Sequence, residues 1–329
     1  MNETIGCIGL GRMGKNMILH LLEGGVNVVG YNRTASVTEE FANEVEAEQF
    51  PSEQNRGSFT SVTTLKSFVD ELPSPRVVFL MVKAGEAVDS VIKELLENGV
   101  TAEDIIIDGG NSFFEDSKRR STTLKEKKIH YIDCGTSGGL EGARYGACLM
   151  LGGEQSLVES LDYIWDGLSK KSVSAPSHVL GGTWTYFGPS GSGHFVKMVH
   201  NGVEYGIDQA IGEGFALLEK SPYDLDLAKV AHNWTKGSVV RGWLVELLAK
   251  ALDKDGHLES YHGSVGGGET GRWTLDTAKK AGVSQEILEQ ALKAREDSQT
   301  TPTFAGKVVS ALRFEYGGHK EESKVESIK

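Results

Sequence analysis

Cysteine is scarce in this chain, and the three that occur, Cys7, Cys134 and Cys148, are far apart and form no CxxC pair. This spacing argues against a disulfide framework and a zinc site, and the apolar surroundings indicate small buried side chains. No apolar run approaches the length that crosses a membrane. The first expected strand begins near Thr4, which leaves no room for a signal peptide, so we expect a cytoplasmic protein.

Positive charge is also in short supply. The 34 Lys and Arg residues face 46 Asp and Glu residues, which gives a formal net charge of -12. Such an acidic chain is a poor partner for nucleic acid or an anionic membrane. An anionic substrate therefore needs a local group of cationic side chains. The length of 329 residues predicts two domains, and the sequence shows no metal-binding constellation.

The N-terminal segment carries a nucleotide-binding pattern. A short apolar strand, Thr4–Ile8, leads into Gly9-Leu-Gly-Arg-Met-Gly14 and then into an amphipathic helix. A GxGxxG turn between a strand and a helix predicts a dinucleotide site, with the pyrophosphate at the helix N-terminus. The residues predicted to contact the cofactor here are Gly9, Leu10, Gly11, Met13 and Gly14.

The next expected strand, Asn27–Tyr31, ends in Asn32-Arg33-Thr34. An NAD enzyme usually places an Asp or Glu there to bind the ribose hydroxyls. A guanidinium, an amide and a hydroxyl suit a 2′-phosphate instead, so we predict NADP, with NAD as the alternative. A purely structural interpretation, in which Arg33 is an exposed residue before the next helix, stays open.

Alternating strands and helices continue along the first half. They predict an α/β fold, a Rossmann-like doubly wound parallel sheet over residues 1–188. Ligands bind at the carboxyl ends of such strands, which places Val82, Lys83 and Ala84 beside the cofactor and Asn111 and Ser137 near substrate. Asn111 and Ser137 are equally compatible with helix caps or turns. The polar segment 48–61 is expected to be an exposed loop.

The second half, residues 189–329, is predicted to be an all-helical domain for substrate binding and dimerisation. Its glycine-rich segment 263–274 is not expected to form regular structure, and its charged tail, 320–329, is expected to be disordered.

The stretch that starts at Gly191 is predicted to begin a long helix that runs to about Lys220, with Ser190 and Ser192 as candidate N-caps. Its spacing places four polar side chains on one face: Lys197, His200, Asn201 and Glu204. A neutral Lys is a general base and a Glu can return a proton, although solvated surface charges are the alternative. Four glycines interrupt this helix, which indicates close approach to its backbone at Gly202, Gly206, Gly212 and Gly214.

Taken in order, these motifs resemble the short form of decarboxylating 6-phosphogluconate dehydrogenase, in the β-hydroxyacid dehydrogenase superfamily. The segments that carry the resemblance are 9–14, 108–112, 135–146, 191–205, 270–274 and 313–319. The resemblance implies that Lys197 takes the C3 hydroxyl proton as hydride leaves for the nicotinamide. The resulting β-keto acid loses CO₂, and Glu204 protonates C1 of the enediol to give ribulose 5-phosphate, without a metal.

The same resemblance implies the binding residues and the assembly. The sugar acid is held by Asn111, Ser137, Gly138, Gly139, His200 and Asn201, and the phosphate end lies near Tyr205, Thr270, Arg295, Arg313 and His319. Asn111 also belongs to the cofactor contacts. Arg313 and His319 are expected to reach into the neighbouring site of a homodimer or homotetramer. The expected role lies in the pentose phosphate pathway or in gluconate utilization.

One position departs from the pattern. Longer members of the family have a Lys where this chain has Gly268, and Arg272 or a water is the expected replacement. Two other functions remain open from the sequence. One is a related dehydrogenase acting on 3-hydroxyisobutyrate or tartronate semialdehyde, which needs neither Glu204 nor a phosphate site. The other is a non-catalytic NADP-binding sensor.

Overall fold

The computed structural model describes residues 3–52 and 56–321, so residues 322–329 of the tail predicted to be disordered lie outside it. The chain separates into two compact units, Met1–Lys197 and Met198–Lys329. The division falls inside the long helix α9, Ser192–Glu219, whereas the sequence placed a domain boundary at residue 188.

The described strands of the first unit form one eight-stranded sheet in the order β3-β2-β1-β4-β5-β6-β7-β8. They are β1 (Thr4–Ile8), β2 (Asn27–Tyr31), β3 (Phe59–Val62), β4 (Val77–Leu80), β5 (Ile105–Asp108), β6 (His130–Ser137), β7 (Cys148–Gly152) and β8 (Trp184–Gly188). Every pairing is parallel except that of β6 with β7. The predicted doubly wound sheet is confirmed, with one antiparallel pairing that the sequence did not predict, so β7 and β8 run opposite to the other six described strands.

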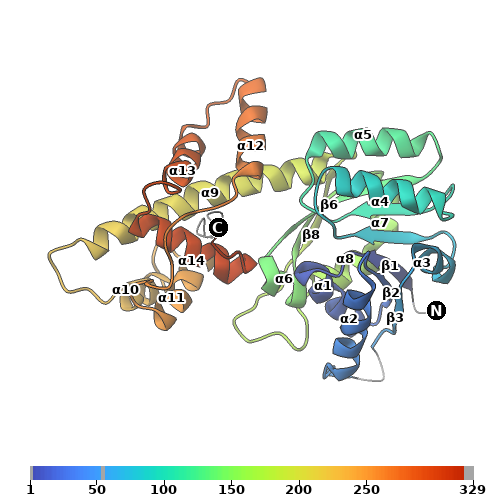
Figure 1. Cartoon of the computed structure of the whole chain (residues 1–329), viewed down its shortest axis with the longest axis horizontal. Helices are drawn as coiled ribbons and strands as arrows, with labels where there is room; N and C mark the ends of the chain where they lie inside the picture. The colour runs from blue at the N-terminus through green and yellow to red at the C-terminus, as the bar shows by residue number, and fades with distance from the viewer. Residues whose placement is uncertain (1–2, 53–55, 322–329) are drawn as a thin grey trace, which may run out of the picture. The chain divides into compact units, whose positions relative to one another are not determined.

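Helices cover both faces of this sheet, as expected for strands such as β4 and β5 that are buried throughout (Figure 1). One apolar core contains side chains from α1 (Arg12–Glu23), α2 (Ala35–Ala47), α6 (Gly139–Tyr145), α7 (Gln155–Ser160) and α8 (Asp162–Ser169). A second core contains side chains from α3 (Leu65–Glu71), α4 (Glu86–Glu97) and α5 (Phe114–Lys125). The two cores lie on opposite faces, which leaves the carboxyl edge of the parallel strands for ligands.

Two predicted loops are wrong at their C-terminal ends. The segment 48–61 contains the start of β3, where Phe59 packs edge-on against Phe41 with ring centroids 5.1 Å apart. The two central residues of β3 are exposed and polar, so the sequence has no apolar pattern there that would indicate a strand. The segment 263–274 contains the start of α12 (Glu269–Lys280), because the glycine run ends at Gly268, whose φ of 116° begins the helix as its N-cap.

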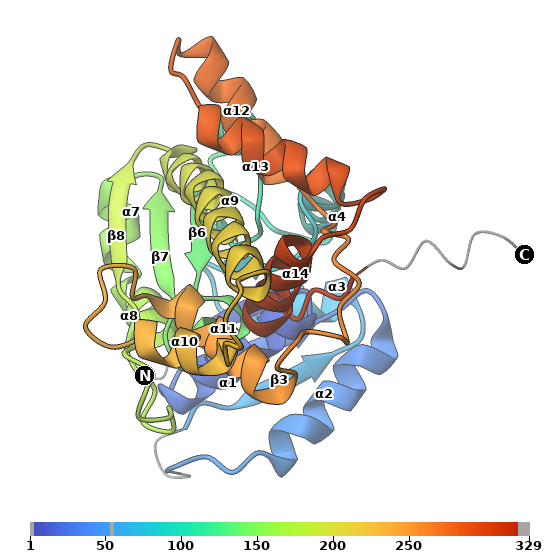
Figure 2. The same cartoon turned by 90° about the vertical axis from the view of Figure 1, so that its left-hand side faces the viewer.

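The second unit is all-helical within the described residues, as predicted. Beside its part of α9 it contains α10 (Leu227–Trp234), α11 (Trp243–Lys254), α12, α13 (Glu286–Asp297) and α14 (Phe304–Gly317). Side chains from α9, α10, α11 and α14 form its core, and α12 and α13 pack side by side (Figure 2).

The glycines of α9 serve this packing. A Cβ built on Gly202 would lie 2.7 Å from Cγ2 of Thr274, and one on Gly212 would lie 2.8 Å from the carbonyl oxygen of Ala305. A Cβ on Gly206 would lie 3.1 Å from Cγ2 of Ile287, whereas no atom lies within 4 Å of the Cβ position of Gly214. Close approach to the backbone is therefore confirmed at three of the four glycines, and the approaching groups are neighbouring helices.

Candidate functional site

The glycine-rich turn between β1 and α1 has the geometry of an anion site. Gly9 has a φ of 102°, and a Cβ there would lie 2.3 Å from the Met81 carbonyl oxygen. A Cβ on Gly14 would lie 2.1 Å from the Gly9 carbonyl oxygen, so both positions require glycine. Gly11 is the N-cap of α1 and has no atom within 4 Å of a Cβ position. No acidic side chain lies in the first turn, so its N–H groups suit a pyrophosphate.

Asn32, at the end of β2, connects that strand by hydrogen bonds to the glycine-rich turn between β1 and α1. Its side-chain oxygen accepts the Leu10 N–H at 3.2 Å, and its amide nitrogen donates to the Thr34 carbonyl at 3.3 Å. Arg33 and Thr34 are exposed, and the first turn of α2 contains no acidic residue. Asn32 therefore shapes the turn, while the groups beside it fit a nucleotide with a 2′-phosphate. Leu10 is 2% exposed, so it offers a ligand its backbone rather than its side chain.

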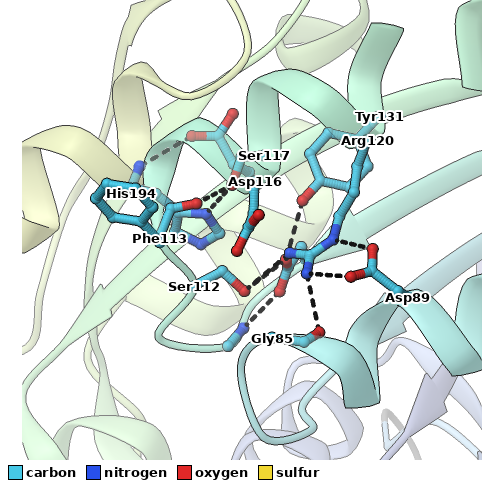
Figure 3. Close-up of polar contacts among 12 residues, drawn as sticks. Gly85, Asp89, Ser112, Phe113, Asp116, Ser117, Arg120, Tyr131 and His194 are labelled. Carbon is cyan, nitrogen blue, oxygen red and sulfur yellow. Dashed lines mark hydrogen bonds and ion pairs between the residues drawn. The ribbon is translucent and has the colours of Figure 1, made fainter. Parts of the chain in front are cut away.

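The loops after β4 and β5 are tied together by Arg120 of α5 (Figure 3). Its Nη1 donates to the Asp108 carboxylate at 3.3 Å, and its Nη2 donates to the Gly85 carbonyl at 2.9 Å. Asp108 also accepts hydrogen bonds from the Ser112 hydroxyl at 2.8 Å and the Tyr131 hydroxyl at 2.9 Å. The loop that carries Asn111 and the loop of residues 82–85 are thus held in fixed relation.

Asp89 holds Arg120 from the other side, through a 2.9 Å bond from Nε. Burial opposes ionisation of the Asp89 carboxyl, but hydrogen bonds from Arg120 and Arg119 keep its pKa below the usual range. Burial and the nearby Asp108 charge raise the pKa of Tyr131 well above its ordinary value, so its hydroxyl stays a donor. The sequence did not reveal this network, because an arginine in a polar helix looks like a surface charge.

Lys197 lies directly over β6. A Cβ built on Gly135 would lie 2.5 Å from Cβ of Lys197, so β6 requires glycine at this point. Two residues further, β6 ends at Ser137, and Gly138, with a φ of 120°, begins α6. Because β5 and β6 are parallel neighbours, Asn111, Ser137 and Lys197 belong to the same carboxyl edge of the sheet.

The N-terminus of α9 is capped by Asp133, a fully buried residue of β6. Its carboxylate accepts the Gly191 N–H at 2.6 Å and the His194 N–H at 2.9 Å. The predicted serine caps are wrong: Ser190 donates to the Tyr131 carbonyl at 3.4 Å, and the buried Ser192 hydroxyl has no hydrogen-bond partner. The His194 ring is fastened to Ser117 at 2.7 Å (Figure 3), which also holds the start of α9.

In the second unit, the predicted phosphate-end residues gather around the glycine segment 266–268. The Arg295 guanidinium stacks on the Tyr205 ring at 4.0 Å, and its Nη1 donates to the Gly266 carbonyl at 3.3 Å. A Cβ on Gly267 would lie 3.0 Å from Nη2 of Arg313. Burial and the neighbouring Arg313 both lower the pKa of Arg295, although Tyr205 opposes this. Two cations held so close together favour an anionic ligand.

The remaining predicted residues lie nearby in the same unit. Nδ1 of His200 lies 3.1 Å from Oδ1 of Asn201 and 3.9 Å from the Glu204 carboxylate. Thr270 is buried in the first turn of α12. His319 follows α14 and is exposed, with its ring 6.4 Å from that of Tyr316.

Arg272, one expected replacement for the missing Lys, lies beside Gly268, and its Nη2 pairs with Glu296 at 2.9 Å. Sequence reasoning also missed two residues of this unit: the buried Asp208, on α9, and Tyr316, whose hydroxyl donates to it at 3.4 Å.

The described residues give no support to a cysteine nucleophile, a metal site or a membrane-spanning helix. Burial raises the pKa of Cys7 and of Cys134 to about 12, so neither is a nucleophile near neutral pH. Among residues 3–52 and 56–321, no three His, Cys, Asp or Glu side chains gather as a metal site, and no helix is long and apolar enough to span a membrane.

Comparisons with known proteins agree with this geometry. Residues 4–177 match the NAD binding domain of 6-phosphogluconate dehydrogenase, and residues 193–324 match the C-terminal domain of the same enzyme. A putative 6-phosphogluconate dehydrogenase of Bacillus subtilis is 40% identical over 97% of this chain and 99% of its own length. The NAD(+)-dependent, decarboxylating enzyme of Haloferax volcanii is 38% identical over 96% of this chain and 97% of its own length.

A solved structure is also similar. The 6-phosphogluconate dehydrogenase of Plasmodium falciparum, studied with NADP+ and with 6-phosphogluconate, has 34% identity and a TM-score of 0.78. The match covers 90% of this chain and 62% of that one.

Proposed function

The chain belongs to the 6-phosphogluconate dehydrogenase family, and from this premise we propose that it oxidatively decarboxylates 6-phosphogluconate to ribulose 5-phosphate and CO₂. The observation that carries the proposal is the placement of Lys197 over Gly135, at the edge of the sheet where Asn111 and Ser137 lie. Glu204 follows on the same helix at i+7, a spacing that keeps two side chains on one face.

In this proposal Lys197 and Glu204 move the protons. The neutral amine of Lys197 takes the proton of the C3 hydroxyl, and the cofactor, when bound, accepts the hydride from C3. The β-keto acid then releases CO₂, because the C3 ketone accepts the electron pair of the breaking bond, and Lys197 returns its proton to that oxygen. Glu204 protonates the carbon that becomes C1 of the product, while the neutral amine of Lys197 takes the proton back from the enediol oxygen, which forms the ketone of ribulose 5-phosphate.

The proposed binding residues form two groups, one for the carboxylate and hydroxyls of the substrate and one for its phosphate. Asn111, Ser137, the backbone of Gly138 and Gly139, His200 and Asn201 hold the carboxylate and hydroxyls. Tyr205, Thr270, Arg295, Arg313 and His319 hold the phosphate. The close pair of Arg295 and Arg313 supports this division, since the chain as a whole is acidic.

We propose NADP as the preferred cofactor. Arg33 and Thr34 are exposed at the end of β2, and neither they nor the first turn of α2 place a carboxylate against a 2′-phosphate. NAD remains the alternative, since relatives of both kinds occur in the family.

A homo-oligomer, a dimer or a tetramer, is also proposed. Val199, Val203 and Ile207 recur at i, i+4 and i+8 on α9 and are 39%, 58% and 45% exposed. A continuous apolar stripe of this kind favours burial against a second copy. We propose that Arg313, which lies beside Gly267 of its own chain, and the exposed His319 both reach into the neighbouring site.

Replacement of Lys197 tests the mechanism. In Lys197→Ala, kcat should fall by about 10²–10⁴-fold, because the general base is lost, while the Kd for NADP changes little. The matched control is Lys229→Ala, whose amine is exposed on α10 and pairs with Asp226, and which should keep wild-type kcat. Turnover that persists in Lys197→Ala with NADP still bound would overturn the proposal.

A further inference from the structure

A second carboxyl lies close to Glu204 in the interior of the second unit. Asp208 follows Glu204 by one turn of α9 and is 0% exposed. The Tyr316 hydroxyl donates to its Oδ2 at 3.4 Å, and its Oδ1 has no hydrogen-bond partner. A buried carboxyl with one oxygen unsatisfied is costly when ionised, so its presence calls for a reason.

The groups that face Asp208 come from three helices. Burial, followed by the Glu204 charge, raises the pKa of Asp208 to about 7. Arg295 of α13, the Tyr316 hydrogen bond and Arg313 of α14 oppose this rise. The balance leaves Asp208 able to gain or lose a proton close to neutral pH.

Tyr316 connects the two carboxyls. Its hydroxyl lies within hydrogen-bonding reach of Glu204 as well as of Asp208. Burial and the charges of both carboxyls raise the pKa of Tyr316 well above its ordinary value, so the hydroxyl keeps its proton. A hydroxyl donates one hydrogen bond and accepts others, so it can bridge an acid and a carboxylate in either direction.

We propose that Asp208 is a positioning residue for Glu204, and that the two carboxyls share a proton through the Tyr316 hydroxyl. In one arrangement Glu204 carries the proton, its O–H donates to Tyr316, and Tyr316 donates to the Asp208 carboxylate. In the other, Asp208 carries the proton and donates to Tyr316, which donates to the Glu204 carboxylate. The number of protons is the same in both.

The consequence is that the shared proton stays on the pair to higher pH than it would on a lone exposed carboxyl. Burial and the Glu204 charge both raise the pKa of Asp208, because a second negative charge in a buried place is unfavourable. The pair then loses its protons in two steps, and the upper step sets the alkaline limit of activity. This inference rests on the proposed role of Glu204 as the general acid.

The kcat–pH profile of Asp208→Asn tests it, with 6-phosphogluconate and NADP both saturating. An amide cannot hold the shared proton, so the alkaline limb should move about one unit toward lower pH. Above that limb kcat should be about tenfold below wild type, while near pH 6 kcat and KM should stay within about twofold.

Two further variants sharpen the test. Tyr316→Phe keeps both carboxyls and removes the bridge, so its limb should move in the same direction. Glu213→Gln changes an exposed carboxyl further along α9, paired with Gln209, and should leave the profile unchanged. Thermal unfolding would establish that each variant is folded, and Tyr316→Phe decides the matter if Asp208→Asn does not fold.

The outcomes separate this inference from the proposed function. If Glu204→Gln loses at least about 100-fold in kcat but Asp208→Asn and Tyr316→Phe keep the wild-type limb, Asp208 has only a structural role. A uniform loss of kcat at every pH contradicts the inference equally. If Glu204→Gln retains full turnover, the proposed function fails first and the role of Asp208 fails with it.

Discussion

Gly135 has no side chain because Lys197 occupies the space above it. The two residues are far apart in the sequence, and only the fold brings the Cβ position of one within 2.5 Å of Cβ of the other. The polar face of α9 was visible in the sequence through helical spacing, but the residues that fix its place were not. Asp133, Arg120 and Asp208 act through partners on other elements, which no local pattern reveals.

Gly135→Ala should therefore damage both stability and activity. The added methyl group must displace Lys197 or β6, at a cost of about 1–3 kcal/mol in the free energy of unfolding, and kcat should fall because the amine moves. Chemical denaturation and kcat measured on the same preparation check this.

Gly214→Ala is the matched control. No atom lies within 4 Å of its Cβ position in α9, so it should gain up to about 1 kcal/mol from helix propensity and keep full activity. An active and fully stable Gly135→Ala protein would show that the Lys197–Gly135 contact is unimportant.

At the scale of elements, the strands and helices with a clear period were predictable, and those without one were not. β4 and β5 are buried along their whole length, so each appears in the sequence as an apolar run that predicts a strand. β3 is half exposed, and the first residues of α12 follow a run of glycines, so β3 and the start of α12 were predicted as loops. The cap of α9 was missed because the carboxylate that supplies it lies on β6.

Asp133→Asn should loosen the N-terminus of α9. An amide offers one oxygen where two backbone N–H groups need acceptors, and its NH₂ group would face a donor. We expect a loss of about 2 kcal/mol in the free energy of unfolding and a lower kcat, because Lys197 lies in the helix that this carboxylate anchors.

The N-cap of α10 provides the comparison. Asp226 is exposed and accepts the Lys229 N–H at 3.1 Å, and Asn is as good an N-cap as Asp, so Asp226→Asn should change stability by no more than about 0.5 kcal/mol. Equal effects of the two substitutions in denaturant titrations would contradict a special role for Asp133.

At the scale of the whole molecule, composition and motif order predicted the fold class and the family, and both are confirmed. The net charge of -12 makes the close pair of Arg295 and Arg313 the feature to explain, since a phosphorylated sugar acid is repelled by the rest of the chain. Related dehydrogenases that act on unphosphorylated hydroxy acids need neither this pair nor a proton donor for an enediol.

The ratio of CO₂ released to NADPH formed tests the central claim most directly. With 6-phosphogluconate labelled at its carboxyl carbon, the account predicts one labelled CO₂ for each NADPH, and no reduction of the cofactor with 3-hydroxyisobutyrate. NADPH formed from 6-phosphogluconate without release of labelled CO₂, or faster turnover of the unphosphorylated acid, would contradict it.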